Sequence, residues 1–236
     1  MAQRFVCLGN SFKEGGRCLA GILLDANNNP IFENQKPKWI RPICETPHGE
    51  VPNCIAVPFQ LLDIIEIDNI TPHPDLYQTE NVLFNNSTLR KIGVFEKNKL
   101  NNICENRKYI FKTRYPSLSE EVVQELDYSL MLIKPTSFEV IEKVYEDRSN
   151  PQQRMVFSYN GFTYDFSITD PVFLRNYQAN PDIVQNIKNV ILSLSVGVKF
   201  PATNRYYKLV AGVIIMESAE ISSNTNSTDY LDDLPF

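Results

Sequence analysis

Short apolar runs separated by turn-forming residues dominate the first third of the chain. Residues 4–8 and 17–24 are apolar runs of strand length, and residues 38–43 and 61–67 repeat the pattern. Residues 9–16 are rich in glycine and polar side chains, which indicates a loop between the first two runs. Strands of this length with turn-rich connections predict a small barrel or sandwich.

The second half of the chain repeats the short-strand pattern and adds short helical segments. Residues 117–126 begin with serine caps and two glutamates, which predicts a helix, and residues 181–187 predict another. Strands are predicted at residues 129–134, 138–145, 154–159, 162–168, 189–199 and 206–215. The expected fold is mainly β with a few short helices: a first barrel over residues 1–84, a connecting segment over 85–127, a second barrel over 128–220, and a flexible tail over 221–236.

The clearest local signal is a hairpin with Asn160-Gly161 at its turn, because both central residues of a tight hairpin need positive φ. Aromatic residues flank the turn on both sides and fall on one face, which suits either a barrel core or a platform for stacked bases. Within this region we expect Arg154 and Tyr159 to lie nearer to solvent. Hairpin pairing would set Tyr159 opposite Phe162 and Phe157 opposite Tyr164, with Phe166 on the same face.

Composition and charge narrow the function classes. The 236 residues carry a formal net charge of −5, which excludes a uniformly basic nucleic-acid binder but not a local basic groove. No apolar run approaches the length of a membrane span, so no membrane partner is predicted. The start of the chain does not resemble a secretory leader, and we expect a cytoplasmic protein with reduced thiols. The five cysteines, which lack metal-site spacing, are Cys7, Cys18, Cys44, Cys54 and Cys104.

Basic and aromatic side chains gather at three further places. The glycine-rich loop carries basic residues where the backbone can approach a ligand closely. The single tryptophan lies between basic residues, which suits either base stacking or a core anchor. A third cluster opens the last strand and suits either phosphate and base contacts or a charged sheet edge that resists aggregation. With the hairpin, the candidate nucleic-acid contacts are Lys13, Arg17, Lys38, Trp39, Arg41, Arg154, Tyr159, Arg205, Tyr206, Tyr207 and Lys208.

Signals of catalysis are sparse. His48 and His73 are the two histidines, and His48 in Pro47-His-Gly-Glu50 lacks the paired cysteines of a zinc deaminase site. Thr169-Asp170-Pro171 is interpreted as a turn rather than a nucleophile. Without a nucleophile, a base and an orienting residue in recognisable spacing, we expect neither an enzyme nor a cofactor. An enzyme with its site in the loop at residues 9–16 remains a third hypothesis.

The end of the sequence is polar and then acidic. Residues 222–228 are small and polar, which is typical of a solvated tether, and an acidic segment with an aromatic end follows. This segment suits either a frayed terminus or a peptide ligand for a basic, apolar pocket. It resembles the acidic tip of bacterial single-stranded DNA-binding proteins, which recruits DNA-processing enzymes. The residues concerned are Asp229, Asp232, Asp233, Leu234, Pro235 and Phe236.

An ordered series of motifs in the first half resembles the dual OB-fold family of bacterial proteins. It begins with residues 7–21 and continues with residues 39–43, His48-Gly-Glu50, residues 62–64 and residues 74–81. Gly9 and Phe12 stand where the family pattern usually has alanine and arginine. The resemblance implies two tandem OB-type barrels and contact with nucleic acid or nucleotides. We therefore predict a non-catalytic protein that binds single-stranded DNA or RNA and whose acidic C-terminal tip recruits DNA-processing partners. The alternative is a protein-interaction or nucleotide-sensing module of a bacterial defence or mobile-element system.

Overall fold

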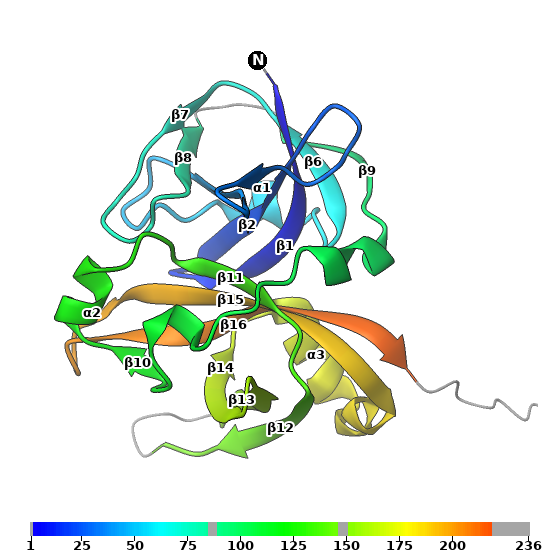
Figure 1. The fold of residues 1–236 in the computed structure, drawn as a ribbon, viewed down its shortest axis with the longest axis vertical. Coiled ribbons are helices and arrows are strands. Elements are labelled where there is room, and N and C mark those ends of the chain that lie inside the picture. Colours follow the sequence, from blue (N-terminus) through cyan, green and yellow to red (C-terminus); the bar gives the residue numbers. More distant parts are fainter. Residues whose placement is uncertain (1, 85–88, 146–150, 219–236) are drawn as a thin grey trace, which may run out of the picture.

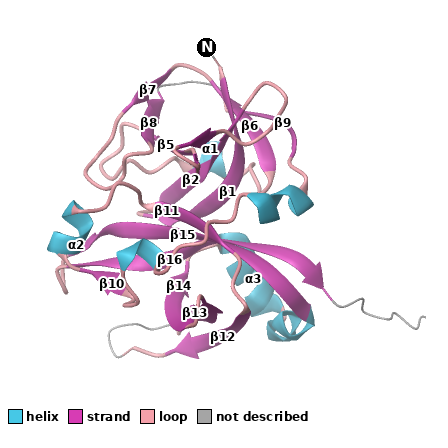
Figure 2. Cartoon of the chain, viewed as in Figure 1, coloured by secondary structure: helices cyan, strands magenta, loops and turns pink. Residues whose placement is uncertain are grey.

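The computed structural model describes residues 2–84, 89–145 and 151–218. Two large β-sheets lie one above the other, and a few short helices surround them (Figures 1 and 2). The first half of the chain forms the upper sheet and the second half forms the lower one (Figure 1). The expected fold class, mainly β with two barrel units, is confirmed.

The first sheet closes on itself as a barrel. Its strand order is β7-β8-β5-β2-β1-β6-β9, so β6 and β7 lie near opposite ends of the sheet. Only Asp68 and Asn69 separate these two strands in the sequence, and one bent segment therefore joins the two ends of the sheet. β5, the third strand of the meander β1-β2-β5, pairs in parallel with β8, and this pairing closes the barrel. The elements are β1 (Gln3–Lys13), β2 (Gly16–Leu24), the hairpin β3 (Phe32–Glu33) and β4 (Lys36–Pro37), β5 (Trp39–Ile43), α1 (Asn53–Ala56), β6 (Asp63–Ile67), β7 (Ile70–Pro72), β8 (Asn81–Phe84) and β9 (Arg90–Val94).

The second sheet repeats this topology. Its order is β11-β15-β16-β14-β13-β12, and the short link between β11 and β12 again lets one bent segment close the barrel. In both barrels a three-stranded antiparallel meander leads to a helix and two more strands, and the third and last strands pair in parallel. The elements are β10 (Ser117–Leu118), β11 (Leu130–Ile133), β12 (Ser137–Lys143), β13 (Gln152–Tyr159), β14 (Phe162–Ile168), α3 (Pro171–Ala179), η3 (Pro181–Asn186), β15 (Ile187–Phe200) and β16 (Arg205–Ser218).

The expected loop at residues 9–16 is mostly strand, so that prediction is wrong. β1 continues to Lys13 through a bulge between Cys7 and Gly9, and only Glu14 and Gly15 form the turn. Gly9 lies at this bulge with ordinary space around it, because a Cβ at this position would lie 3.6 Å from the side chain of Ala20. The glycine and polar residues of this stretch therefore belong to a bulged strand rather than to a loop.

The expected connecting segment contributes to both sheets. β9 pairs with β6 of the first barrel, and β10 pairs with β16 of the second. Because Ser117 and Leu118 are used in that pairing, the helix predicted from residue 117 is shorter and begins after Ser119. The remaining elements of the segment are η1 (Lys97–Asn102), η2 (Ile110–Lys112) and α2 (Glu120–Gln124).

The turn predicted at Thr169-Asp170-Pro171 is the start of a helix. The carboxylate of Asp170 accepts hydrogen bonds from the backbone N–H groups of Val172 (2.9 Å) and Phe173 (3.1 Å), which makes it the N-cap of α3. Its other oxygen accepts from the Val213 backbone at 3.0 Å. Proline at the first helical position fits this arrangement, because its missing N–H would have no partner there.

The aromatic hairpin is part of the second barrel's core. Tyr159 lies opposite Phe162 and Phe157 opposite Tyr164, as the turn predicts. Phe157, Tyr159 and Tyr164 are all buried, and Phe157 and Tyr164 stack with their ring centroids 5.6 Å apart. The core alternative is thus confirmed for this hairpin.

The two barrels share a third apolar cluster. Val6 and Ile22 on the outer surface of the first barrel pack in the same cluster as Ile191 and Ile214 of the second. The backbones approach so closely that a Cβ at Gly212 would lie 2.3 Å from the carbonyl oxygen of Leu8. Only glycine fits at that position without displacing the backbone.

Candidate nucleic-acid interface

The outer face of β2 and β5 in the first barrel is covered by the second barrel. In OB barrels the second and third strands of the meander and the neighbouring loops form the ligand face. Here the Arg41 guanidinium on this face forms an ion pair with Glu80 at 3.2 Å and donates to Ser195 Oγ at 3.3 Å. Burial opposes the charge, but Glu80, Cys18 and Tyr77 together outweigh burial and hold the pKa of Arg41 above its ordinary value. Arg41 is 1% exposed. The prediction that Arg41 contacts nucleic acid is therefore wrong, because the side chain is not accessible to a ligand.

The loop between β7 and β8 also contacts the second barrel. The Tyr77 hydroxyl donates to the carbonyl of Gly197 at 2.8 Å, and Thr79 Oγ1 donates to the carbonyl of Asp127 at 2.8 Å. In a free OB barrel this loop would border the ligand face. The first barrel's face and its bordering loop are thus both engaged by the second barrel.

The equivalent face of the second barrel is hollowed into an open cavity of about 440 Å³, which we name the second-barrel groove. Its floor is the outer surface of β13, β14 and β16, and aromatic and apolar side chains rise around it. Phe200 and Tyr207 are 42% and 36% exposed, and their rings meet edge to face with centroids 6.0 Å apart. Val198 and Tyr145 add to the apolar wall. Exposed rings of this kind are able to stack on unpaired bases.

Arg154 forms part of the groove floor rather than an exposed contact. Its guanidinium donates to Asp165 at 2.5 Å, to Ser167 Oγ at 2.8 Å and to Gln152 Oε1 at 2.8 Å. These contacts fix the side chain and pair its charge with that of Asp165. Arg154 is 9% exposed. The expectation that it lies near solvent is wrong, because neighbouring polar groups on β13 and β14 satisfy its donors.

Tyr159, the second residue expected near solvent, is also buried. Its hydroxyl donates to the carbonyl of Glu105 at 2.9 Å and accepts from the backbone N–H of Arg107 at 2.8 Å. Tyr159 therefore fixes the connecting segment to the second barrel. Burial raises the pKa of this hydroxyl.

The cluster at residues 205–208 divides between two faces, as alternation in β16 requires. Tyr207 faces the groove, whereas Tyr206 and Lys208 point inward and are buried. Lys208 Nζ donates to the carbonyls of Ile110 and Thr113, each at 2.7 Å, and burial lowers its pKa to about 7. Tyr206 donates to the Glu120 carboxylate at 3.2 Å. Of this cluster, the structure brings Tyr207 to the candidate site.

Arg205 belongs to the same outer face as Tyr207 but is held by a neighbouring strand. Its Nε donates to Ser117 Oγ of β10 at 3.2 Å. It does not line the groove. The side chain thus links β10 to β16 beside the site.

The tip of the first barrel extends the groove with an exposed ring and a cation. The backbone N–H of Phe12 donates to the carbonyl of Thr169, a residue of the groove wall, at 2.9 Å. Phe12 is 55% exposed, and the Arg17 guanidinium carbon lies 4.5 Å from its ring centroid. Burial lowers the pKa of both Arg17 and the adjacent Lys13. We name Phe12 and Arg17 the flanking pair.

Two functional candidates escaped prediction from the sequence. Phe12 stands where the family pattern has a basic residue, and Phe200 is an aromatic residue just before the turn Pro201-Ala-Thr-Asn204. An aromatic residue at the end of a long strand, followed by a turn, was the available signal for Phe200. Exposure of either ring depends on neighbours far away in the sequence.

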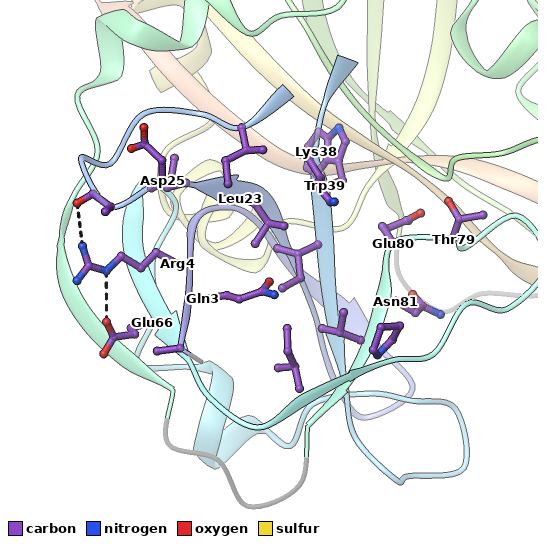
Figure 3. Close-up of a pocket in the computed structure, with 18 residues that line it drawn as sticks. Gln3, Arg4, Leu23, Asp25, Lys38, Trp39, Glu66, Thr79, Glu80 and Asn81 are labelled. Carbon is purple, nitrogen blue, oxygen red and sulfur yellow. Dashed lines mark hydrogen bonds and ion pairs between the residues drawn. The ribbon is translucent and has the colours of Figure 1, made fainter. Parts of the chain in front are cut away.

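Lys38 and Trp39 lie away from the groove, at the open end of the first barrel (Figure 3). This end holds a cavity of about 720 Å³, which we name the first-barrel cavity. Lys38 is exposed and forms an ion pair with Glu33 at 3.3 Å. Trp39 is half-buried, and it packs against the cluster between the barrels while its edge reaches the cavity.

In the described ranges, no group of three or more His, Cys, Asp or Glu side chains is placed to hold a metal ion. All five cysteines lie in these ranges and are free thiols. Residues 2–84, 89–145 and 151–218 include no helix with the length and apolar character of a membrane span. The predicted partner-binding residues Asp229, Asp232, Asp233 and 234–236 lie outside the described residues.

The sequence matches the family model of the dual OB-containing domain over residues 3–213. The chain belongs to this family. No curated protein sequence matches it. This assignment agrees with the repeated barrel topology and confirms the fold that the motif series implied.

Two solved structures resemble the chain at low similarity. One is a Replication Protein A heterotrimer bound to ssDNA, with 12% identity and a TM-score of 0.38 over 94% of this chain and 49% of that chain. The other is a murine DNA-binding protein bound with ds DNA, with 11% identity and a TM-score of 0.33 over 91% of this chain and 97% of that chain. The present chain spans about half the length of the first of these. At such TM-scores neither structure carries an argument about function.

Proposed function

We propose that this chain is a non-catalytic protein that binds single-stranded DNA or RNA in the second-barrel groove. The observation that carries the proposal is the pair of exposed rings, Phe200 and Tyr207, on the face that OB barrels use for oligonucleotides. Aromatic rings stack on any unpaired base, whereas bases inside a duplex are already stacked. An unpaired strand is therefore the ligand that this face suits best.

The charges around the groove support the same ligand. Lys143 is exposed, with its Nζ 5.5 Å from the ring centroid of Tyr145 at one side of the groove, and Arg17 lies at the flanking pair. Cations beside aromatic rings are suited to phosphates that alternate with stacked bases. Because the chain carries a formal net charge of −5, we expect modest affinity that falls as salt rises.

The acidic tail extends the proposal to partner proteins. Asp232, Asp233 and the residues Leu234-Pro235-Phe236 combine negative charge with an apolar end, which suits a basic pocket on a DNA-processing enzyme. Deleting residues 234–236 should abolish capture of such an enzyme and leave oligonucleotide affinity unchanged. Equal capture by the full and shortened chains would remove the tail from this role.

Fluorescence anisotropy with labelled homothymidine and homouridine strands tests the binding proposal. At low salt we expect binding to the wild-type chain, and Tyr207→Ala or Phe200→Ala should each weaken it. Base stacking on an aromatic ring contributes about 1–3 kcal/mol, which corresponds to a loss of about 5- to 150-fold in affinity. Phe32→Ala is the matched control, because Phe32 is 50% exposed on the β3–β4 hairpin and does not line the groove.

Two results would contradict the proposal. One is a wild-type chain that binds neither strand at low salt, where electrostatic attraction is strongest. The other is an equal loss of affinity in Phe32→Ala and Tyr207→Ala, which would place the contact elsewhere.

A further inference from the structure

The first-barrel cavity is the unfilled end of a barrel that is closed at its other end. At the closed end, Asn10 Nδ2 donates to the carbonyls of Ala56 (2.9 Å) and Phe59 (2.8 Å), which fixes α1 and the following turn over the core. At the opposite end of β1, around Gln3, no helix covers the barrel in the described part of the chain, and the cavity of about 720 Å³ opens. This volume is typical of sites for small molecules.

The walls of the cavity are largely apolar. Leu23 of β2 and Ile40 of β5 come from the barrel core, and Ile70 and Val82 come from the strands that close it. Trp39 forms part of the edge (Figure 3). A ligand here gains free energy by burying flat or compact apolar surface.

The charged groups of the rim already have ion-pair or hydrogen-bond partners, so among the described residues the cavity offers no free cation to an anionic ligand. Each rim carboxylate or cation has a partner of opposite charge or accepts backbone N–H bonds. A charged ligand would have to displace one of these partners or lose its water without compensation. The contacts are Arg4–Glu66 at 3.3 Å, Lys38–Glu33 at 3.3 Å, Glu80–Arg41 at 3.2 Å, and the Asp25 carboxylate with the backbone N–H groups of Asn27 and Asn29, each at 2.8 Å.

Three uncharged polar groups of the lining remain available: the Gln3 carboxamide, and the Asn81 Oδ1 and Trp39 Nε1 atoms, which are buried without a hydrogen-bond partner among the described residues. The side chain of Gln3 points toward the middle of the cavity (Figure 3), and it makes no hydrogen bond to any described residue. A carboxamide presents one acceptor and two donor hydrogens side by side. The edge of a nucleobase offers the complementary pair, and glutamine recognises adenine in this bidentate manner.

We propose that the first-barrel cavity binds a neutral nucleobase, presented by a free nucleoside or by the end of a strand. Its apolar walls take the faces of the base, and the Gln3 carboxamide pairs with its edge. In the described part of the chain, the phosphate of a nucleotide would meet a rim whose cations are all paired, and the Asp25 carboxylate, which has hydrogen-bond donors but no cationic partner, would repel it. Unphosphorylated nucleosides should therefore bind better than nucleoside 5′-monophosphates.

The fluorescence of Trp39 provides a direct test, because Trp39 is the chain's single tryptophan and lies at the cavity. Titration of the full chain with adenosine should quench this fluorescence to saturation, and adenosine 5′-monophosphate should act only at higher concentration. Gln3→Leu should weaken adenosine binding on the order of tenfold, the effect of losing a hydrogen-bonded polar contact to the ligand. The matched control is Gln124→Leu, the same change at an exposed position of α2.

The outcomes separate this site from the groove. Tyr207→Ala should leave the adenosine response intact even where it abolishes oligonucleotide binding, so each proposal stands or fails alone. If an oligonucleotide quenches the fluorescence of Trp39 and adenosine does not, the nucleobase that the cavity binds is the one at the end of a strand. No quenching by any nucleoside or oligonucleotide, tighter binding of the monophosphate, or an equal response to toluene would overturn the proposal.

Discussion

Replacing Arg41 by methionine tests whether this buried cation holds the two barrels together. Its side chain is 2% exposed and that of Glu80 is 6% exposed, and the two charged groups lie 3.2 Å apart. Methionine has a similar length and keeps the packing, but it leaves the Glu80 carboxylate with the Ser129 hydroxyl as its remaining side-chain partner among the described residues. An unpaired buried charge costs about 3–5 kcal/mol, so we expect Arg41→Met to destabilise the fold by that amount.

Urea unfolding followed by circular dichroism measures this effect as a shift in midpoint. Lys99→Met is the control, because Lys99 forms an exposed ion pair with Glu96 at 2.8 Å and should change stability by less than about 1 kcal/mol. Adding Glu80→Gln to Arg41→Met should restore part of the stability, since it removes the unpaired charge. The reasoning is refuted if Arg41→Met unfolds at the same urea concentration as Lys99→Met. It is also refuted if Arg41→Met loses oligonucleotide affinity at full stability, which would make Arg41 the direct contact that the sequence suggests.

Three further changes probe other parts of the fold. Gly212→Ala places a Cβ 2.3 Å from the Leu8 carbonyl oxygen, so we expect a loss of about 1–3 kcal/mol and a lower melting temperature. An unchanged melting temperature would contradict the close approach of the barrels. Asp170→Ala removes the acceptor of three backbone N–H groups and should cost about 2–4 kcal/mol by urea unfolding, with Asp170→Asn less severe. Lys208 has its folded-state pKa lowered to about 7, below the ordinary value of 10.5, so the unfolded chain binds more protons between these values and this group adds stability as pH rises through that window. The unfolding free energy of the wild type minus that of Lys208→Met should therefore rise by up to about 1.4 kcal/mol per pH unit above pH 7. A difference that stays constant with pH would show that Lys208 titrates normally.

The strand pattern was readable from the sequence because alternation and turn chemistry are local. Asn160-Gly161 predicts both the hairpin and its register, and the structure has the pairs that this turn requires. The helix at Asp170-Pro171 also carried a local signal, an N-cap followed by proline, but the segment was interpreted as a turn. Residues 9–13 misled for the opposite reason: their small and polar composition is typical of a loop, yet they pair with β2 as part of a bulged strand.

The candidate site was harder to predict because burial of a charge depends on distant partners. Arg41 and Lys208 look like surface cations in the sequence, yet both are buried. Arg41 is paired with Glu80, and Lys208 donates to the carbonyl groups of Ile110 and Thr113. No local pattern shows that a second barrel covers the ligand face of the first. Tyr207 was identified correctly as lying at a strand opening, but its exposure and its contact with Phe200 follow from the β15–β16 pairing.

The central claim is that an unpaired strand lies on the second barrel, since the matching face of the first is covered. Photocrosslinking of the full chain to a thiouridine-containing strand, followed by mass spectrometry, tests this claim most directly. We predict cross-links within residues 200–208, which include Phe200 and Tyr207, with weaker ones near Phe12. Cross-links confined to residues 18–22 and 41–43 would contradict the account, because they would show that the strand reaches the face that the second barrel covers.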